Sequence, residues 1–151
     1  RVPPQRRPAE RGARMTFQPV AALPIDADLW WIVYLRGALV GRTEPYAQNV
    51  YFARRVPPTR RDRMVIVRRD GGNVSGVFDR PRVAIDVWAK TDQEATDLAR
   101  LTIALALDAP GTEGCVRVQH MSGPNSVADP SGQPRRLSLI EATHRTDVLA
   151  P

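Results

Sequence analysis

The sequence has few of the residues from which disulfides, metal sites and cofactor sites are built. Cys115 is the only cysteine, so no internal disulfide can form and nothing indicates an oxidising compartment. The two histidines, His120 and His144, lie in separate segments, and together with one cysteine they make a poor set of metal ligands. We therefore expect a small buried thiol at Cys115, no metal and no cofactor.

Long apolar runs are missing as well. The longest candidate, at residues 29–35, is far shorter than the ~18 residues that a membrane-spanning helix requires, so we expect no membrane partner. Residues 1–14 are rich in arginine and proline and lack the apolar stretch of a secretory signal. With 151 residues, 42% of them hydrophobic and 25% charged, the chain has the size and composition of one globular domain.

The usual sequence patterns of catalysis are also missing. Asp86 lies in the middle of a predicted strand, and no second carboxylate lies at a fixed sequence distance from it to make an acid/base pair. Ser122 lacks the flanking glycines of a nucleophile elbow, and the glycine-rich segment 71–76 lies in a predicted hairpin, not between a strand and a helix. His120 and His144 could form a pair, but two separate histidines are the simpler interpretation. The sequence therefore predicts a protein that is not an enzyme.

The formal net charge of +6 is concentrated in two segments. Residues 1–14 carry five arginines against one glutamate, and residues 1–22 are predicted to form a flexible, basic, proline-rich arm. Since Met15 could be an original start, an arm without function is an equal alternative. Residues 54–69 carry seven arginines against one aspartate. Such a stripe could bind phosphates, but salt bridges to acidic neighbours in an assembly are the favoured interpretation.

Helical periodicity predicts a first helix that begins near Asp26, a suitable N-cap, and ends before Gly41. Its apolar residues between 29 and 39 cover one broad face. Trp30 and Trp31 point about 100° apart on such a helix, so only one of them is expected at the centre of the core. We expect Trp31 to be the one that contacts a partner, with simple partial burial as the alternative.

Apolar patterning predicts six strands, at residues 50–53, 64–67, 74–78, 82–90, 115–121 and 136–145. A hairpin turn is expected at 70–73, and the Asp-Arg-Pro sequence at 79–81 is expected to end the strand before it. The strand at 82–90 alternates most regularly, which indicates one fully buried face. The adjacent Leu139 and Ile140 shift the alternation of the last strand, and a bulge there would reconcile its two halves.

A second helix is predicted directly after the fourth strand. Thr91 and Glu94 have the spacing of a capping box, and the Pro-Gly sequence at 110–111 ends the helix. Its apolar stripe is rich in small residues, which would let it lie close on a sheet. The segment 122–134 is full of turn-forming residues and is too long for a tight hairpin, so we expect a loop that contacts a partner.

These elements predict an α/β (α+β) fold. It consists of one mixed, mostly antiparallel sheet with two helices packed on one face, in the order α-β-β-β-β-α-β-β. The domain is expected to span residues 23–146, between the arm at 1–22 and a C-terminal tail at 147–151.

A series of short motifs supports a more specific interpretation. They are Tyr-Leu-Arg at 34–36, Arg-Val-Pro at 55–57, Val-Arg-Arg at 67–69 with Gly-Gly at 71–72, Asp-Arg-Pro-Arg-Val at 79–83, Asp-Val-Trp-Ala at 86–89, Ala-Thr-Asp-Leu-Ala at 95–99, and Gly-Pro, Asp-Pro and Pro-Arg-Arg within 123–136. In their order and spacing, over roughly residues 23–146, they resemble the tail terminator proteins of long-tailed, siphovirus-like bacteriophages of actinobacteria. The arm at 1–14 lies outside this pattern, and the segment 59–63 is richer in arginine than the pattern.

The resemblance implies a structural virion protein at the head-proximal end of the phage tail, assembled in the host cytoplasm. Such a protein forms a homo-oligomeric, hexameric ring that caps the tail tube, ends its polymerisation and joins the tail to the head-side connector, or stopper, protein. The implied partners are copies of the chain itself, the major tail tube protein and the connector, while DNA only passes through the ring lumen. The alternatives are a head-completion or neck connector protein and, from another class, an Arg-rich nucleic-acid-binding module.

A ring requires heterologous contacts, in which two different surfaces of one subunit meet across each interface. An arginine-rich surface and acids such as Asp92, Asp97, Asp108 and Glu113 could supply complementary charges. The candidate assembly residues are Trp31, Arg55, Arg60, Arg61, Arg63, Arg68, Arg69, Trp88, Asp129 and Arg135.

Overall fold

The computed structural model describes residues 1–4 and 19–150. In chain order its elements are β1 (Ala21–Leu23), α1 (Ala27–Leu39), the short 3-10 helix η1 (Pro45–Ala47), β2 (Tyr51–Ala53), β3 (Met64–Ser75), β4 (Phe78–Trp88), α2 (Asp92–Leu107), β5 (Cys115–Ser126), β6 (Arg135–Arg145) and β7 (Asp147–Leu149). Five strands form one sheet in the spatial order β2-β3-β4-β6-β5, and β1 pairs with β7 in a separate two-stranded sheet. Within the large sheet only β2 and β3 are parallel.

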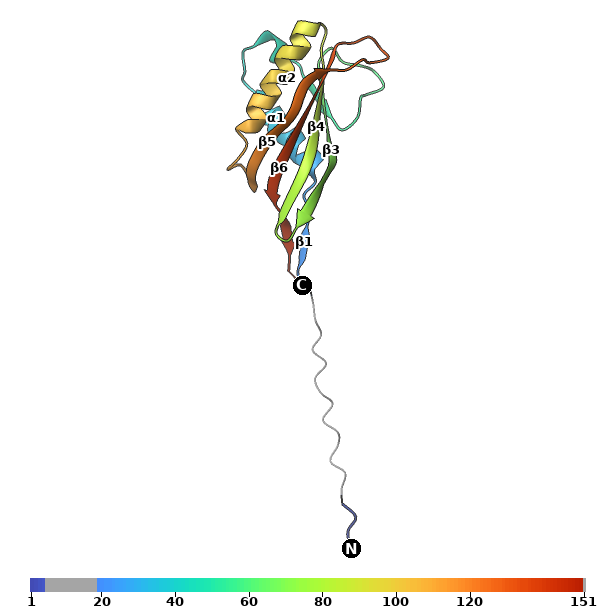
Figure 1. Cartoon of the computed structure of the whole chain (residues 1–151), viewed down its shortest axis with the longest axis vertical. Helices are drawn as coiled ribbons and strands as arrows, with labels where there is room; N and C mark the ends of the chain where they lie inside the picture. The colour runs from blue at the N-terminus through green and yellow to red at the C-terminus, as the bar shows by residue number, and fades with distance from the viewer. Residues whose placement is uncertain (5–18, 151) are drawn as a thin grey trace.

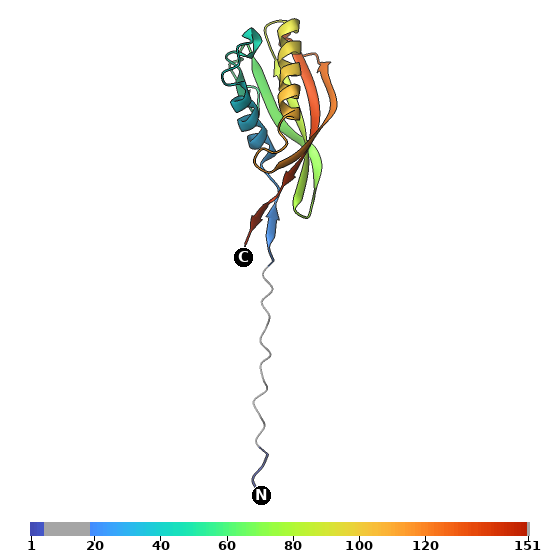
Figure 2. The same cartoon turned by 90° about the vertical axis from the view of Figure 1, so that its left-hand side faces the viewer.

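Both helices lie on the same face of the five-stranded sheet, as Figure 2 shows. α1 packs over β3 and β4, and α2 packs over β4, β6 and β5. The predicted α+β class, a mixed and mostly antiparallel sheet with two helices on one face, is therefore confirmed. The predicted order of elements agrees broadly, except that the strand expected at 64–67 continues to residue 75 as β3, and the strand expected at 74–78 spans the end of β3, the turn at 76–77 and the start of β4. Neither α-helix of the described residues has the length and apolar character that crossing a membrane requires.

The starts of both helices follow from their capping residues. Asp26 accepts a hydrogen bond from the Leu29 N–H through Oδ1 (3.2 Å) at the start of α1. Thr91 accepts one from the Glu94 N–H through Oγ1 (3.1 Å) at the start of α2. Each bond satisfies one of the N–H groups that a helix leaves unpaired at its first turn, and both predicted starts are confirmed.

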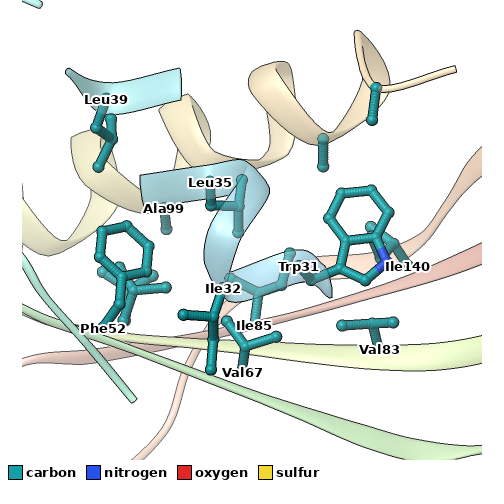
Figure 3. Close-up of a cluster of buried hydrophobic side chains, with 14 of the residues drawn as sticks. Trp31, Ile32, Leu35, Leu39, Phe52, Val67, Val83, Ile85, Ala99 and Ile140 are labelled. Atoms are coloured by element: carbon teal, nitrogen blue, oxygen red, sulfur yellow. The ribbon is translucent and has the colours of Figure 1, made fainter. Parts of the chain in front are cut away.

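The main core lies between the helices and the sheet (Figure 3). Trp31 and Leu35 of α1 are fully buried there, together with Val83 and Ile85 on the helix-facing side of β4. Of the five buried residues of α2, only Leu98 is large, so this helix lies close on the sheet as expected. Each large apolar side chain buried in this way stabilises the fold by about 1.5–3 kcal/mol.

A second, smaller core lies on the opposite face of the sheet, where β4 ends. Trp88 of β4 packs there against Met64 and Ile66 of β3, and all three are buried. Side chains from the segment 51–56 cover this cluster. β4 is therefore buried on both faces from residue 83 onward, although its alternation predicted one buried face, because side chains of β2 and of the segment after it pack on the other face.

The hairpin between β3 and β4 turns later than the sequence predicts. The turn expected at 70–73 is wrong, because pairing continues through a register shift just before Gly72 and the chain turns at 76–77. Gly72 has a φ of +94°, and a Cβ there would collide with the Arg80 carbonyl oxygen, so only glycine fits. Pro81 pairs with Gly72 and does not end β4, because a bulge interrupts the ladder locally and tolerates proline.

β5 is longer than predicted and takes up the first residues of the segment 122–134, for which the sequence predicts a loop. Its pairing with β6 shifts register on both sides of Ser122, opposite Leu139. The bulge predicted at 139–140 therefore lies in β5, while β6 stays in register with β4. Cys115, at the start of β5, has a buried thiol as predicted.

The β1–β7 pair, which we call the terminal ribbon, extends beyond the large sheet (Figures 1 and 2). Its antiparallel pairs run from Ala21 with Leu149 to Leu23 with Asp147. The end of the predicted arm and the start of the predicted C-terminal tail are thus paired with each other. Residues 5–18 of that arm and residue 151 lie outside the described residues.

Candidate assembly surface

Two loops meet near the end of the sheet where β4 finishes, and they carry half of the predicted assembly residues (Figure 1). The Arg60 guanidinium lies 3.2 Å from the Asp129 carboxylate. The Gln133 side-chain amide donates hydrogen bonds to the carbonyl oxygens of Arg61 (3.0 Å) and Asp62 (3.3 Å). The two loops therefore hold each other in place within one chain.

Asp86 organises three more of the predicted residues. Its fully buried carboxylate accepts two hydrogen bonds from Arg135, at 2.8 and 2.6 Å, and lies 3.7 Å from Arg68. The same Arg135 guanidinium lies over the Trp88 ring, 4.8 Å from its centroid, where a cation–π contact adds to the ion pair. The hydrogen bonds to Asp86 raise the pKa of Arg135 above its ordinary value. Arg68, Trp88 and Arg135 are thus engaged inside the subunit.

Arg69 and Arg63 are also engaged within the chain. Arg69 donates two hydrogen bonds, at 2.8 and 2.7 Å, to the fully buried Asp79, and these bonds raise the pKa of Arg69. Arg63 lies 3.1 Å from Glu94 on α2. Such bidentate and partly buried pairs are structural elements of a fold more often than contact points for a partner.

Trp31 requires a correction. Its side chain is fully buried and donates a hydrogen bond from Nε1 to Nε2 of His144 (3.1 Å), so it is not available to a partner and the prediction for it is wrong. Trp30 is the partly exposed tryptophan of the pair. Its ring stacks on Tyr34 at 5.4 Å, and its Nε1 donates to the Glu113 carbonyl oxygen (3.3 Å). The choice between adjacent tryptophans depended on the direction of the core, which the sequence alone does not give.

The ten predicted residues therefore do not form one free surface. Among them, Arg55 and Arg61 are exposed and form no ion pair with the described residues. Arg61 lies over the Tyr51 ring, 5.2 Å from its centroid. At this end of the molecule, far fewer arginines are free to contact a neighbour than the number of arginines suggests.

An apolar groove along α1 was not predicted. It has a volume of about 850 Å³ and is lined by residues of α1 together with segments 112–114 and 145–147. Leu29 and Val33, one turn apart on α1, are 50% and 57% exposed at the groove. We call this feature the α1 groove. The sequence did contain a signal for this groove. The apolar stripe of α1 includes Leu29, Trp30 and Val33, and a stripe this broad is not covered completely when one side of the helix packs on a sheet.

The face of the sheet opposite the helices carries a third surface. Side chains alternate along a strand, so Arg80 and Arg82 of β4 point away from the helix-facing Val83, and both are exposed. Arg82 pairs with Glu141 of β6, which is the acid nearest to it in the register. Arg117 of β5 is exposed on the same face, so the bare part of this face is basic.

The described residues do not assemble a recognisable catalytic or metal centre. No three histidine, cysteine, aspartate or glutamate side chains in the part of the chain that the structure describes converge as metal ligands. The two histidines do not form a pair. His120 is exposed and its ring bonds to the Gly123 carbonyl oxygen (2.8 Å), whereas His144 is buried against Trp31, and that burial lowers the pKa of His144 to about 4.

No family model matches the chain, and no curated protein matches it significantly in sequence.

Proposed function

We propose that the chain is a structural virion protein that forms a ring on a phage tail tube, ends tube polymerisation and joins the tail to the head-side connector. The observation that carries this proposal is the presence of two separate exposed apolar surfaces on one small subunit, the α1 groove and the terminal ribbon. Large exposed apolar surfaces mark sites of association. Two different ones suit the heterologous contacts of a closed ring. The more specific part of the proposal, a tail terminator, comes from the resemblance of the motif series between residues 34 and 136 to those phage proteins.

In this proposal the chain works by binding and carries out no catalysis. Its partners are copies of itself, in a ring of six, the major tail tube protein and the head-side connector. It is assembled in the host cytoplasm and is located at the head-proximal end of the tail, where DNA passes through the ring lumen. A head-completion or neck connector protein would use the same kind of surfaces and remains the alternative within virion assembly.

Growth of tail tubes tests the proposal. Purified tail tube protein polymerises with and without the chain, and tube lengths and tube ends are measured by electron microscopy. A terminator shortens the tubes in proportion to its concentration and leaves a ring at one end of each tube. Tubes that lengthen normally with no ring at either end would count against the proposal, and binding to the head portal complex instead would favour the neck protein.

A second candidate function, nucleic-acid binding, is favoured by the exposed arginines on the helix-free sheet face, Arg80, Arg82 and Arg117. It predicts DNA binding that weakens steeply with salt, and a log–log salt slope that falls by about one for each phosphate-contacting arginine removed. Binding isotherms of the wild type and of Arg82→Ala between low and moderate salt measure this. Absence of DNA binding at low salt would reject this candidate and leave the ring proposal intact.

A further inference from the structure

The terminal ribbon exposes apolar side chains that the fold does not cover. Val20, Leu23, Val148 and Leu149, in and directly before the ribbon, are between 41% and 59% exposed. None of these residues belongs to either core cluster. An isolated two-stranded ribbon is marginally stable in water at best. The ribbon is therefore the element of this chain that gains most from a covering surface.

The α1 groove is a surface of the matching kind. Leu29 and Val33 form its apolar wall, Trp30 and Tyr34 stack on each other beside them, and Gly37 adds no side chain at the far end. The groove is open along its length, and its volume of about 850 Å³ accommodates several aliphatic side chains. Its lining runs along α1 from residue 25 to residue 38, a length of about three helical turns, which matches an extended element of a few residues.

The ribbon does not fill the groove of its own subunit. Thr146 and Asp147 line the rim of the groove and lead directly into β7, and from that rim the ribbon extends away from the domain (Figures 1 and 2). One subunit thus presents an apolar projection and an open apolar groove at neighbouring positions. This is the arrangement that head-to-tail contacts of a ring require, because each copy gives one surface and receives the other.

The charged residues that line the groove beside the ribbon are of both signs. Glu113, Asp147 and Arg145 line the groove, and none of the three forms an ion pair with the described residues. The apolar match therefore selects the partner, because the exposed aliphatic side chains of the ribbon of another copy suit the aliphatic wall of the groove.

We propose that the terminal ribbon of one copy docks into the α1 groove of the next copy, and that this contact joins the subunits of the ring. The inference rests on the proposed ring function and adds to it the two surfaces that meet. In the docked state Val148 or Leu149 of one copy lies against Leu29 and Val33 of its neighbour. The contact is heterologous, so two ribbons or two grooves do not pair with each other.

Disulfide trapping between full-length chains tests this contact. Val33→Cys and Val148→Cys are made separately, mixed at high protein concentration and oxidised. The native Cys115 does not compete, since it is buried and burial raises the pKa of its thiol to about 11, which keeps it protonated at pH 8. We expect the mixture to give a cross-linked heterodimer at least tenfold above either variant alone. A mixture of Met121→Cys with Val148→Cys is the control, because Met121 is comparably exposed but lies outside the groove.

The double variant Val33→Cys/Val148→Cys separates docking in trans from docking in cis. A ladder of cross-linked oligomers that ends at a closed ring supports the proposal. A monomer with an internal disulfide, or no product above the Met121→Cys control, overturns it. If rings form on tail tubes while these cross-links are absent, ribbon docking fails and the ring function stands. If no self-association occurs even with tubes present, the proposed function fails as well.

Substitution of the groove wall provides an independent measurement. Leu29→Asp introduces a charge at a half-exposed position, so folding is retained while the apolar groove is spoiled. We expect it to weaken self-association at least tenfold in sedimentation, whereas Met121→Asp leaves self-association unchanged. Circular dichroism verifies that both variants are folded. Equal loss in both folded variants, or no loss in Leu29→Asp, would overturn the proposal.

Discussion

Asp79 and Asp86 are fully buried, and each accepts two hydrogen bonds from one arginine, Arg69 and Arg135 respectively. A buried carboxylate is costly unless it is paired and hydrogen-bonded, so these arginines are fixed by the carboxylates that they neutralise. This is why the arginine-rich stretch does not behave as a free basic stripe. A count of arginines along the sequence therefore overstates the charge that is free to bind DNA or a partner. Only arginines without an intramolecular ion pair contribute to it.

Replacement of Asp86 tests this view of the arginines. Asp86→Ala leaves the partly buried Arg135 and the nearby Arg68 without their acceptor, and we expect the free energy of unfolding to fall by about 3 kcal/mol. Arg82→Ala, an exposed position on the same strand, should change it by less than about 0.5 kcal/mol. Urea denaturation measures both variants. Equal stabilities would mean that the buried pair does not hold this end of the sheet.

His144 gives the chain a predictable pH dependence. Burial lowers its pKa in the folded state to about 4, below the value of about 6.5 expected when unfolded. Between these values the unfolded chain binds more protons, so the free energy of unfolding falls as the pH drops from 6.5 to 4 and levels off below 4. Between pH 7 and pH 5 we expect a loss of about 2 kcal/mol from this residue.

The control for this prediction is His144→Gln, which keeps an acceptor for the Trp31 N–H but does not titrate. Urea denaturation at pH 7 and pH 5 should show a smaller loss of stability in the variant than in the wild type. If His144→Gln lost as much free energy of unfolding between pH 7 and pH 5 as the wild type does, the assignment of this titration to His144 would be contradicted.

At the scale of elements, β3 and β4 form a long paired hairpin with a bulge at residues 70–72. Two adjacent glycines there have positive φ, Gly71 at +86° and Gly72 at +94°, but only a Cβ at Gly72 would meet backbone atoms of β4. The sequence predicts a turn at this place because turn residues and bulge residues are the same types. Pattern alone could not distinguish them, since the distinction depends on the pairing of the next strand.

Alanine variants of Gly71 and Gly72 test how closely the backbones of β3 and β4 approach each other. Gly71→Ala places a side chain in open space and has only the strain of positive φ, about 1 kcal/mol. Gly72→Ala adds a collision with the backbone of Arg80 and Pro81. We expect its free energy of unfolding to lie about 2 kcal/mol below that of Gly71→Ala. Thermal and urea unfolding of the two variants measure the difference. Variants of equal stability would contradict a bulge in this register.

Local features of the elements were predictable, and long-range ones were not. The helix starts at Asp26 and Thr91 were predicted because a cap involves residues only three positions apart. The terminal ribbon joins residues 21–23 to residues 147–149, and the Asp86–Arg135 pair spans 49 positions. No local periodicity encodes such partners. The same limit explains why the exposed side of α1 was assigned to the wrong tryptophan.

At the scale of the whole molecule, one compact α+β domain leaves three surfaces for other molecules. These are the α1 groove, the terminal ribbon and the arginine-bearing sheet face. In a ring, the first two account for contacts between copies, and the third is free to face the tube, the connector or the DNA path. The proposed function is thus a property of the surfaces in combination.

A particle reconstruction of phage tails assembled in the presence of this chain tests the proposed function most directly. The account predicts a ring of six copies at the head-proximal end of the tail tube, with the ribbon of each copy seated along α1 of the next. Density for the chain in the capsid or the neck above the connector, or its absence from the virion, would contradict the account.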